Sequence, residues 1–225
     1  MDLVREKVKE KIVFVTGATG YMGCALIPRL LARGHHVLAL ARGGSERRLP
    51  EGSEAVAGDA LDAATYCERV PRGATLVHLV GVAHPSPAKA AEFRSVDLAS
   101  LKASLAAARG AGVAHVVYLS VAQPSPVMKA YQAARAEGER LLSESAIDVT
   151  ILRPWYVLGP GHRWPYVLLP FYALLELLPP TRAGARRLGL VTLGQMTAAL
   201  VAAVENPPAG LRIVTVPEIR AAPAV

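Results

Sequence analysis

Short apolar runs alternate with longer segments of helical period along most of the chain. Continuous apolar or β-branched runs predict strands at residues 12–16, 37–41, 55–57, 75–80, 115–120, 149–152 and 211–216. Apolar positions at helical spacing predict helices at 21–33, 61–70, 93–109, 129–145, 167–178 and 192–204. Gly34 and Gly110 mark the expected ends of the first and third helices. Strands that alternate with helices favour parallel pairing and a Rossmann-type, doubly wound α/β sheet.

The pattern changes after Pro154, where prolines and glycines interrupt every long element up to residue 189. Residues 1–154 are predicted to form the Rossmann core, and residues 155–225 a small C-terminal excursion that returns to it within one structural domain. We expect the apolar helix at 167–178 to be core. A contact with a partner or a membrane surface is the alternative. The tail after Pro217 is predicted to be loose.

Composition narrows the class of protein. Hydrophobic residues make up 52% of the 225 positions and charged residues 19%, which suits one well-filled α/β domain. The formal charge of +7 raises the question of nucleic acid, but no basic run is interleaved with aromatic residues. We therefore expect no nucleic-acid partner, and the surplus also fits a protein that holds a polyanionic cofactor. The sequence sets no oligomeric state.

Two cysteines and the apolar runs bear on compartment. Cys24 and Cys67 form neither a disulfide framework nor a metal-ligand pattern, which favours a reducing compartment and no metal site. The charged N-terminal residues lack the apolar core of a signal peptide. The longest apolar stretch, residues 166–178, is too short to cross a bilayer. A cytoplasmic protein without an integral membrane span is expected.

The most specific motif is a glycine-rich turn between the first strand and the first helix. Gly17, Gly20 and Gly23 are spaced by three in the segment 16–23. Gly17 permits a tight turn, Gly20 lets the backbone approach a pyrophosphate, and Gly23 lets the helix pack on the sheet. Phosphates bind at such a helix N-terminus, where unpaired N–H groups and the helix dipole favour negative charge. The motif and its context predict a dinucleotide site.

The residues after the second and third strands bear on the choice of dinucleotide. Arg42 follows the second strand where an acid would hold the ribose of NAD, and an arginine there suits the 2′-phosphate of NADP. We therefore predict NADP, with NAD as second choice. Asp59 follows the third strand and has two interpretations. It accepts a hydrogen bond from the adenine amino group, or it caps the next helix, a task that Asp62 also suits.

Six segments together resemble the extended and atypical short-chain dehydrogenases/reductases, including their epimerase/dehydratase-like and NmrA-like branches. They are residues 16–23, 58–59, 78–81, 118–120, 131–139 and 151–161, in family order. The resemblance implies a small-molecule substrate and places His162, Arg163 and Trp164 in the region that forms the substrate pocket. The cofactor-binding residues it implies, together with the glycine turn, are Gly17, Thr19, Gly20, Tyr21, Met22, Gly23, Arg42, Asp59, Ala60, Val80, Gly81, Tyr131 and Pro154.

The family's catalytic group is a Ser, a Tyr and a Lys four residues after the Tyr. Ser120 and Tyr131 match the first two, while Arg135 stands at the Lys position. An unperturbed Tyr titrates near 10, so a neighbouring cation helps it act as an acid or base at neutral pH. Arg135 supplies a cation but cannot shuttle a proton. His78 and His84 are expected to flank the nicotinamide end, more as hydrogen-bonded structure than as acid or base.

Two functions follow from these residues. The first is a small NADP-dependent oxidoreductase or epimerase-like enzyme, with Tyr131 exchanging the proton and Ser120 steadying the substrate oxygen. The apolar segment 166–175 favours a quinone or lipid-like carbonyl over a sugar nucleotide. The second is a non-catalytic NADPH-binding protein, either a redox sensor or a subunit stabilised by its cofactor, which Arg135 favours.

Overall fold

A computed structural model of the chain describes residues 10–161 and 167–223. Its centre is a seven-stranded sheet of order β3-β2-β1-β4-β5-β6-β9, in which each strand pairs in parallel with its neighbours. The strands are β1 (Ile12–Thr16), β2 (His36–Ala41), β3 (Glu54–Ala57), β4 (Thr75–His78), β5 (His115–Leu119), β6 (Asp148–Leu152) and β9 (Leu211–Val214). The chain reverses its direction of travel across the sheet between β1 and β4. Such a switch point opens a crevice at the carboxyl ends of the strands.

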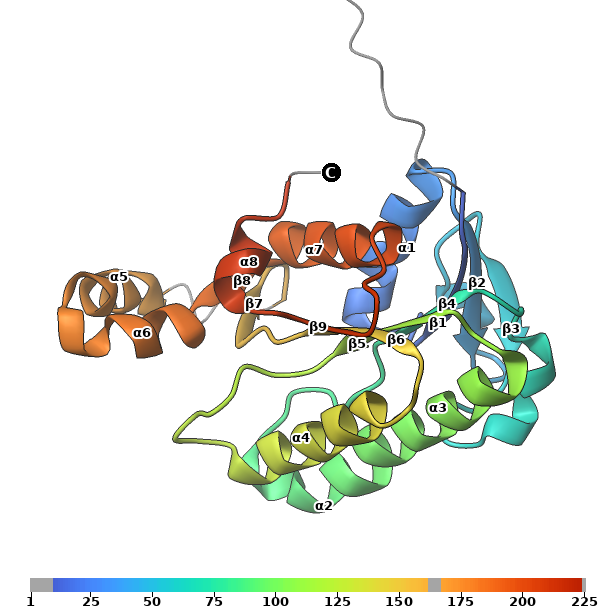
Figure 1. Cartoon of the computed structure of the whole chain (residues 1–225), viewed down its shortest axis with the longest axis horizontal. Coiled ribbons are helices and arrows are strands. Elements are labelled where there is room, and N and C mark those ends of the chain that lie inside the picture. Colours follow the sequence, from blue (N-terminus) through green and yellow to red (C-terminus); the bar gives the residue numbers. More distant parts are fainter. Residues whose placement is uncertain (1–9, 162–166, 224–225) are drawn as a thin grey trace, which may run out of the picture.

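Helices cover both faces of this sheet (Figure 1). The helices of the described residues are α1 (Tyr21–Ala32), α2 (Ala90–Glu92), α3 (Ala99–Ala111), α4 (Lys129–Ser143), α5 (Leu169–Leu177), α6 (Pro179–Arg187), α7 (Leu193–Glu205) and α8 (Val216–Arg220). Leucines and valines of α1 and α7 pack on one face, and side chains of α3 and α4 pack on the other. The sheet is thus buried on both sides, which explains why its strands read as continuous apolar runs. The predicted Rossmann-type fold is confirmed.

The helix predicted at residues 61–70 is wrong. The segment forms two 3₁₀ turns, Ala63–Thr65 and Cys67–Arg69. The hydroxyl of Thr65 donates to the carbonyl of Asp62 and accepts from the backbone N–H of Asp59. Side chains that bond the nearby backbone in this way compete with helix formation.

The long helix predicted at 93–109 begins earlier, ends later and is irregular. It runs from α2 through a π-helical turn, Phe93–Leu98, into α3. Its left-handed C-terminal residue is Gly112, at φ 69°, and not Gly110, which lies inside α3. A π-helical turn often marks a functional position, and this one carries the buried Asp97.

The C-terminal excursion departs most from expectation. Strands β7 (Tyr156–Leu158) and β8 (Leu190–Thr192) form a separate two-stranded parallel sheet. The tail predicted to be loose forms α8, held at its start by a capping box between Thr215 and Glu218. The apolar helix ends at Leu177, before α6, and its side chains are largely exposed, so the core assignment is wrong. No helix within residues 10–161 and 167–223 is long and apolar enough to cross a membrane.

Candidate functional site

The glycine turn lies at the switch point, between β1 and α1. Gly17 adopts φ +75°, a left-handed conformation, and a Cβ there would stand 2.8 Å from the backbone carbon of Leu79. Gly23 lies inside α1, and a Cβ there would stand 2.5 Å from the carbonyl oxygens of Gly17 and Ala18. Only glycine therefore fits at both positions, and the backbone forms a concave surface at the N-terminus of α1. This geometry suits the pyrophosphate of a dinucleotide.

Replacing Gly17 with alanine is expected to weaken cofactor binding at least about tenfold and to destabilise the fold by about 1–3 kcal/mol. The added methyl group meets the backbone after β4 and strains a left-handed residue. NADPH fluorescence titration and thermal unfolding measure the two effects. Gly43→Ala is the matched control, because a Cβ at Gly43 meets nothing within 4 Å. Equal affinity in the two variants would contradict the assignment of the turn.

A cleft of about 470 Å³ extends from the glycine turn across the carboxyl ends of β2, β3 and β4. It brings together most of the predicted cofactor residues, namely Gly17, Thr19, Gly20, Arg42, Asp59, Ala60, Val80 and Gly81. Five others do not line it: Tyr21 and Tyr131 line the adjoining cavity described below, and Met22, Gly23 and Pro154 line neither pocket. Met22 packs against the core, Gly23 lies inside α1, and Pro154 is buried with its carbonyl accepting from the N–H of Ala122.

The basic residues at one end of this cleft are Arg42 and Arg48. Arg42 is exposed and lines the cleft, and Arg48 donates to the carbonyl of Thr19 in the glycine turn at 3.0 Å. Asp59 lines the cleft too, and its Oδ1 accepts from the N–H of Leu61 at 3.0 Å. Asp62 caps the first 3₁₀ turn by accepting from Ala64. Both carboxylates thus serve local turns, while Asp59 also faces the cleft.

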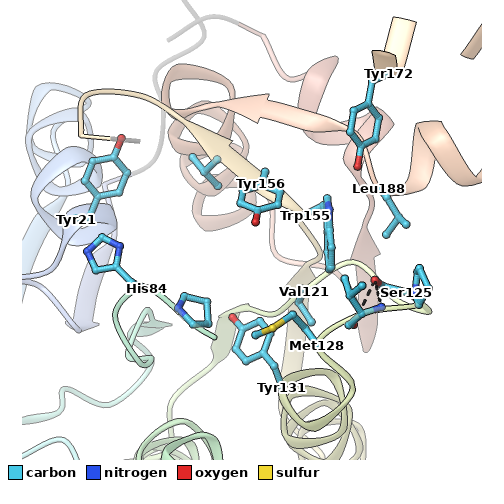
Figure 2. Close-up of a pocket in the computed structure, with 14 residues that line it drawn as sticks. Tyr21, His84, Val121, Ser125, Met128, Tyr131, Trp155, Tyr156, Tyr172 and Leu188 are labelled. Carbon is cyan, nitrogen blue, oxygen red and sulfur yellow. Dashed lines mark hydrogen bonds between the residues drawn. The ribbon is translucent and has the colours of Figure 1, made fainter. Parts of the chain in front are cut away.

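A second cavity, of about 610 Å³, adjoins the cleft along the carboxyl edge of the sheet (Figure 2). Tyr21 and His84 line it and follow directly on the cleft residues Gly20 and Ala83. The rest of the wall is mostly apolar and aromatic, and consists of Pro85, Val121, Ser125, Pro126, Val127, Met128, Tyr131, Trp155, Tyr156, Val157, Tyr172 and Leu188. Such a cavity suits an apolar ligand with a few polar groups that orient it.

Tyr131 is half-buried at the start of α4, and Figure 2 shows its side chain facing the cavity. Its ring lies 5.0 Å from the ring of Phe93. The guanidinium carbon of Arg135 lies 5.2 Å from the centre of the Tyr131 ring, within cation–π range. The aromatic neighbour and the cation fix the side chain, with its hydroxyl toward the cavity.

Arg135 is buried beneath this wall and does not line either pocket. It donates to Asp97 Oδ1 at 2.6 Å and to the carbonyl of Leu119 at 2.9 Å. The other oxygen of Asp97 accepts from the N–H of Val82 at 3.0 Å. Burial opposes the charge of Arg135, but Tyr131, Tyr118 and Asp97 outweigh it and raise its pKa. The guanidinium thus joins α4 to the π-helical turn and to the end of β5, and Asp97 joins this group to the loop after β4.

Ser120 is buried at the end of β5, and its hydroxyl donates to Glu139 of α4 at 2.5 Å. Glu139 also forms an ion pair with Arg153, whose Nε lies 3.0 Å from Oε1. The neighbour of Ser120 that faces the cavity is Val121. Ser120, Glu139 and Arg153 therefore form a polar cluster beside the cavity, and the catalytic assignments of Ser120, Tyr131 and Arg135 stay predictions.

The two histidines differ. His78 is fully buried, and its Nδ1 lies 3.0 Å from the hydroxyls of both Thr16 and Ser104. Burial, with a smaller effect of Arg135, lowers the pKa of His78 to about 3, so the ring is neutral and structural. His84 is exposed and lines the cavity. The predicted pocket residues His162, Arg163 and Trp164 lie outside the described residues.

Sequence reasoning missed several cavity residues, among them Ser125, Met128, Trp155 and Tyr156. Ser125 is held by Gln132, which accepts from its N–H at 2.8 Å and donates to its carbonyl at 3.1 Å. The aromatic pair Trp155 and Tyr156 directly follows Pro154 at the end of β6. That position, at the carboxyl end of a strand of the central sheet, is the signal in the sequence.

Together the fold, the glycine turn and the paired pockets define a nicotinamide-dinucleotide-binding protein with an adjoining apolar site. A sequence model of the NAD(P)H-binding family matches residues 17–165. The chain therefore belongs to this family of NAD(P)H-binding proteins, and it shares its fold with short-chain dehydrogenases/reductases.

Three relatives that are reductases by their names are similar to this chain. The 3-diazoavenalumate denitrifying reductase of a Streptomyces species is 33% identical over 90% of this chain and 75% of its own length. The ceramide reductase of Caulobacter vibrioides is 27% identical over 89% of this chain, and the divinyl chlorophyllide a 8-vinyl-reductase of Zea mays 34% over 64%. The chain spans 63% and 40% of the lengths of these two relatives.

Solved structures share the fold. The Bordetella bronchiseptica enzyme WbmH, in complex with NAD⁺, superposes with a TM-score of 0.67 at 20% identity, over 92% of this chain and 76% of its own. The Thermus thermophilus UDP-glucose 4-epimerase, in complex with NAD, gives 0.66 at 21% identity, over 93% and 81%. At such identities the likeness concerns the fold alone.

Proposed function

We propose that this protein is an NADPH-dependent reductase of an apolar carbonyl or quinone-type substrate. The observation that carries the proposal is the position of Tyr131, whose side chain faces an apolar cavity of about 610 Å³ next to the glycine-turn cleft. A positioned hydroxyl at the junction of a cofactor cleft and a substrate cavity is the arrangement that carbonyl reduction needs.

The residues of the cleft fit a nicotinamide dinucleotide. The glycine turn leaves room that a Cβ would fill, and the N-terminus of α1 supplies N–H groups for phosphate. Arg42 and Arg48 give the adenosine end a positive charge that suits a 2′-phosphate. When bound, the reduced nicotinamide ring supplies a hydride.

Replacing Arg42 with alanine is expected to raise the dissociation constant of NADPH about tenfold or more while that of NADH hardly changes. A charge-assisted hydrogen bond to a phosphate is worth about 1.5–3 kcal/mol, and NADH lacks that phosphate. Titration of cofactor fluorescence at fixed ionic strength measures both constants. Arg47→Ala is the control, because Arg47 is exposed nearby but does not line the cleft. Equal loss for NADPH and NADH would argue against NADP preference.

The chain's own contribution to the reaction is proton transfer and orientation. We assign Tyr131 the proton that the substrate oxygen gains on reduction, and the neighbouring Arg135 stabilises the tyrosinate left behind. Ser125 also lines the cavity and offers a hydroxyl to the substrate oxygen. Ser120 acts through Glu139, which it orients on α4, and so positions the helix that carries Tyr131.

The wall of the cavity argues for an apolar substrate. Val121, Met128, Trp155 and Leu188 supply apolar surface, and polar groups come mainly from tyrosine, serine and histidine side chains. Two relatives act on apolar molecules by their names, a ceramide reductase and a ketoreductase of a farnesyl-bearing quinoline oxide from Stigmatella aurantiaca. A panel of quinones and long-chain aldehydes or ketones, with NADPH oxidation as readout, tests the proposal.

A second candidate function is a non-catalytic NADPH-binding protein. The observation in its favour is that the hydroxyl of Ser120 and the guanidinium of Arg135 are both committed to buried carboxylates, Glu139 and Asp97. In that case Tyr131 seals the cofactor pocket. Tight NADPH binding without turnover on any member of the panel would favour this candidate over the first.

A further inference from the structure

Helices α5 and α6 form a hairpin that projects from the body of the protein, at the left of Figure 1. The segment 167–178 exposes five large hydrophobic side chains, as many as the rest of the described chain together. They are Val167, Phe171, Leu174, Leu177 and Leu178. A cluster of this kind on one projecting element marks an interaction surface.

The two sides of α5 differ in what they contact. Tyr172 lines the cavity and Glu176 forms an ion pair with Arg220 of α8 at 2.8 Å, so this side faces the body. Phe171, Leu174 and Leu177 follow at helical spacing on the opposite side and are 55–70% exposed. The exposed side of α5 is therefore continuously apolar.

The exposed side of α6 is basic. Ala185 faces the body, while Arg182, Arg186 and Arg187 are exposed. Arg182 donates to the carbonyls of Glu176 and Leu177 and so caps the end of α5. The sequence from 167 to 188 contains one acidic residue, Glu176, which is already paired with Arg220. An apolar surface and a positive surface thus lie side by side on one hairpin.

We propose that the α5–α6 hairpin docks on the surface of a bilayer that contains anionic lipids. The side chains of Phe171, Leu174 and Leu177 enter the boundary of the acyl chains, and Arg186 and Arg187 contact the phosphate groups. Apolar insertion combined with basic side chains is the physical pattern of helices that lie in a membrane interface. The net charge of +7 adds a long-range attraction to a negative surface.

Charge argues against a second copy of the chain as the occupant. A symmetric contact between two hairpins would bring the arginines of both copies together, and neither hairpin offers an unpaired carboxylate to neutralise them. An anionic lipid surface, in contrast, supplies the negative charge that neutralises the arginines of the hairpin. Docking by the hairpin also holds the cavity near the bilayer, because Tyr172 of α5 forms part of its wall. Docking depends on the hairpin alone and not on the proposed reaction.

Vesicle flotation tests the inference without any substrate. The wild-type protein is mixed with phosphatidylcholine vesicles that contain about 30% phosphatidylglycerol, and with pure phosphatidylcholine vesicles, at low and high salt. The test variant is Leu177→Asp/Arg186→Glu. The control is Leu211→Asp/Arg212→Glu, which makes the same chemical changes at exposed positions of β9, outside the hairpin. Unfolding temperature and NADPH affinity verify that each variant is folded.

We expect the wild type and the β9 variant to float with the anionic vesicles, and the partition coefficient of the hairpin variant to fall at least about tenfold. High salt should weaken wild-type binding without abolishing it, because the apolar contribution remains. Wild-type protein that stays unbound, or equal binding of both variants, would overturn the inference. A wild-type dimer in sedimentation that the hairpin variant disrupts, without vesicle binding, would assign the surface to a second copy.

Discussion

Tyr131→Phe is expected to lower the rate of substrate-dependent NADPH oxidation by about 10²–10⁴-fold, the usual contribution of a general acid. The variant keeps the ring that packs on Phe93 and Arg135 and loses only the hydroxyl that faces the cavity. The dissociation constant of NADPH should therefore change little. Steady-state kinetics on the best substrate of the quinone and carbonyl panel, with cofactor titration alongside, provides the measurement.

Tyr156→Phe is the matched control, because Tyr156 lines the same cavity from β7. We expect it to keep most of the activity and to change mainly the KM. If Tyr131→Phe retains a comparable share of the wild-type rate, Tyr131 is a wall of the cavity and not the proton donor. Loss of NADPH binding in Tyr131→Phe would instead indicate a cofactor contact.

Arg135→Met is expected to destabilise the protein by about 3–5 kcal/mol, since it leaves the carboxylate of Asp97 buried without its partner. The two side chains are only 6% and 1% exposed and lie 2.6 Å apart. Thermal and denaturant unfolding measure the loss. Arg140→Met is the control, because Arg140 pairs with Glu137 and Glu144 at an exposed position, where such pairs contribute about 0–1 kcal/mol.

The pH dependence of the stability of Arg135→Met shows whether the unpaired carboxylate of Asp97 causes the loss. Burial raises the pKa of Asp97, and Arg135 partly offsets this, so removing the guanidinium raises that pKa further. The folded variant then binds the proton of Asp97 more tightly than the unfolded chain does. Protonated Asp97 therefore destabilises the variant least below the ordinary pKa of aspartate, about 3.9. The free energy of unfolding of the variant falls as the pH rises from there through the raised pKa of Asp97.

A double variant distinguishes this explanation from simple loss of packing. Asp97→Asn/Arg135→Met removes the buried charge and keeps an oxygen for the N–H of Val82. It should recover most of the lost stability, and its stability should lack the pH dependence that Asp97 causes in the single variant. Equal destabilisation of the single and double variants, at every pH, would show that the ion pair itself contributes little.

The sequence predicted the sheet and the cofactor cleft because both depend on local patterns. Buried parallel strands require continuous apolar runs, and the turn at Gly17 requires glycine for steric reasons. Each apolar run and the glycine turn can be recognised within a segment of about ten residues. The prediction of a helix at 61–70 is wrong for a reason that is also local. The side chains of Asp59, Asp62 and Thr65 form hydrogen bonds with the nearby backbone, and these bonds compete with a helix.

The local sequence pattern does not predict that the α5–α6 hairpin is exposed. Apolar content alone favours burial for residues 167–178, and the sequence cannot show that the body offers only one side for α5 to pack against. The small sheet of β7 and β8 pairs strands more than thirty residues apart, so its register is likewise a property of the folded chain. Only the tertiary arrangement shows which side of α5 is left exposed.

The sequence by itself determined the fold class, the dinucleotide turn and the positions of Tyr131 and Arg135 on one helix. The tertiary structure decided what these residues contact. It directed Ser120 toward Glu139 and Arg135 toward Asp97, and it left Tyr131 facing the cavity. Glycine turns and strand patterns are set by backbone sterics and burial over a few residues. The partner of a buried charge is set by packing between elements distant in sequence, because any of several carboxylates could satisfy it until the helices are placed.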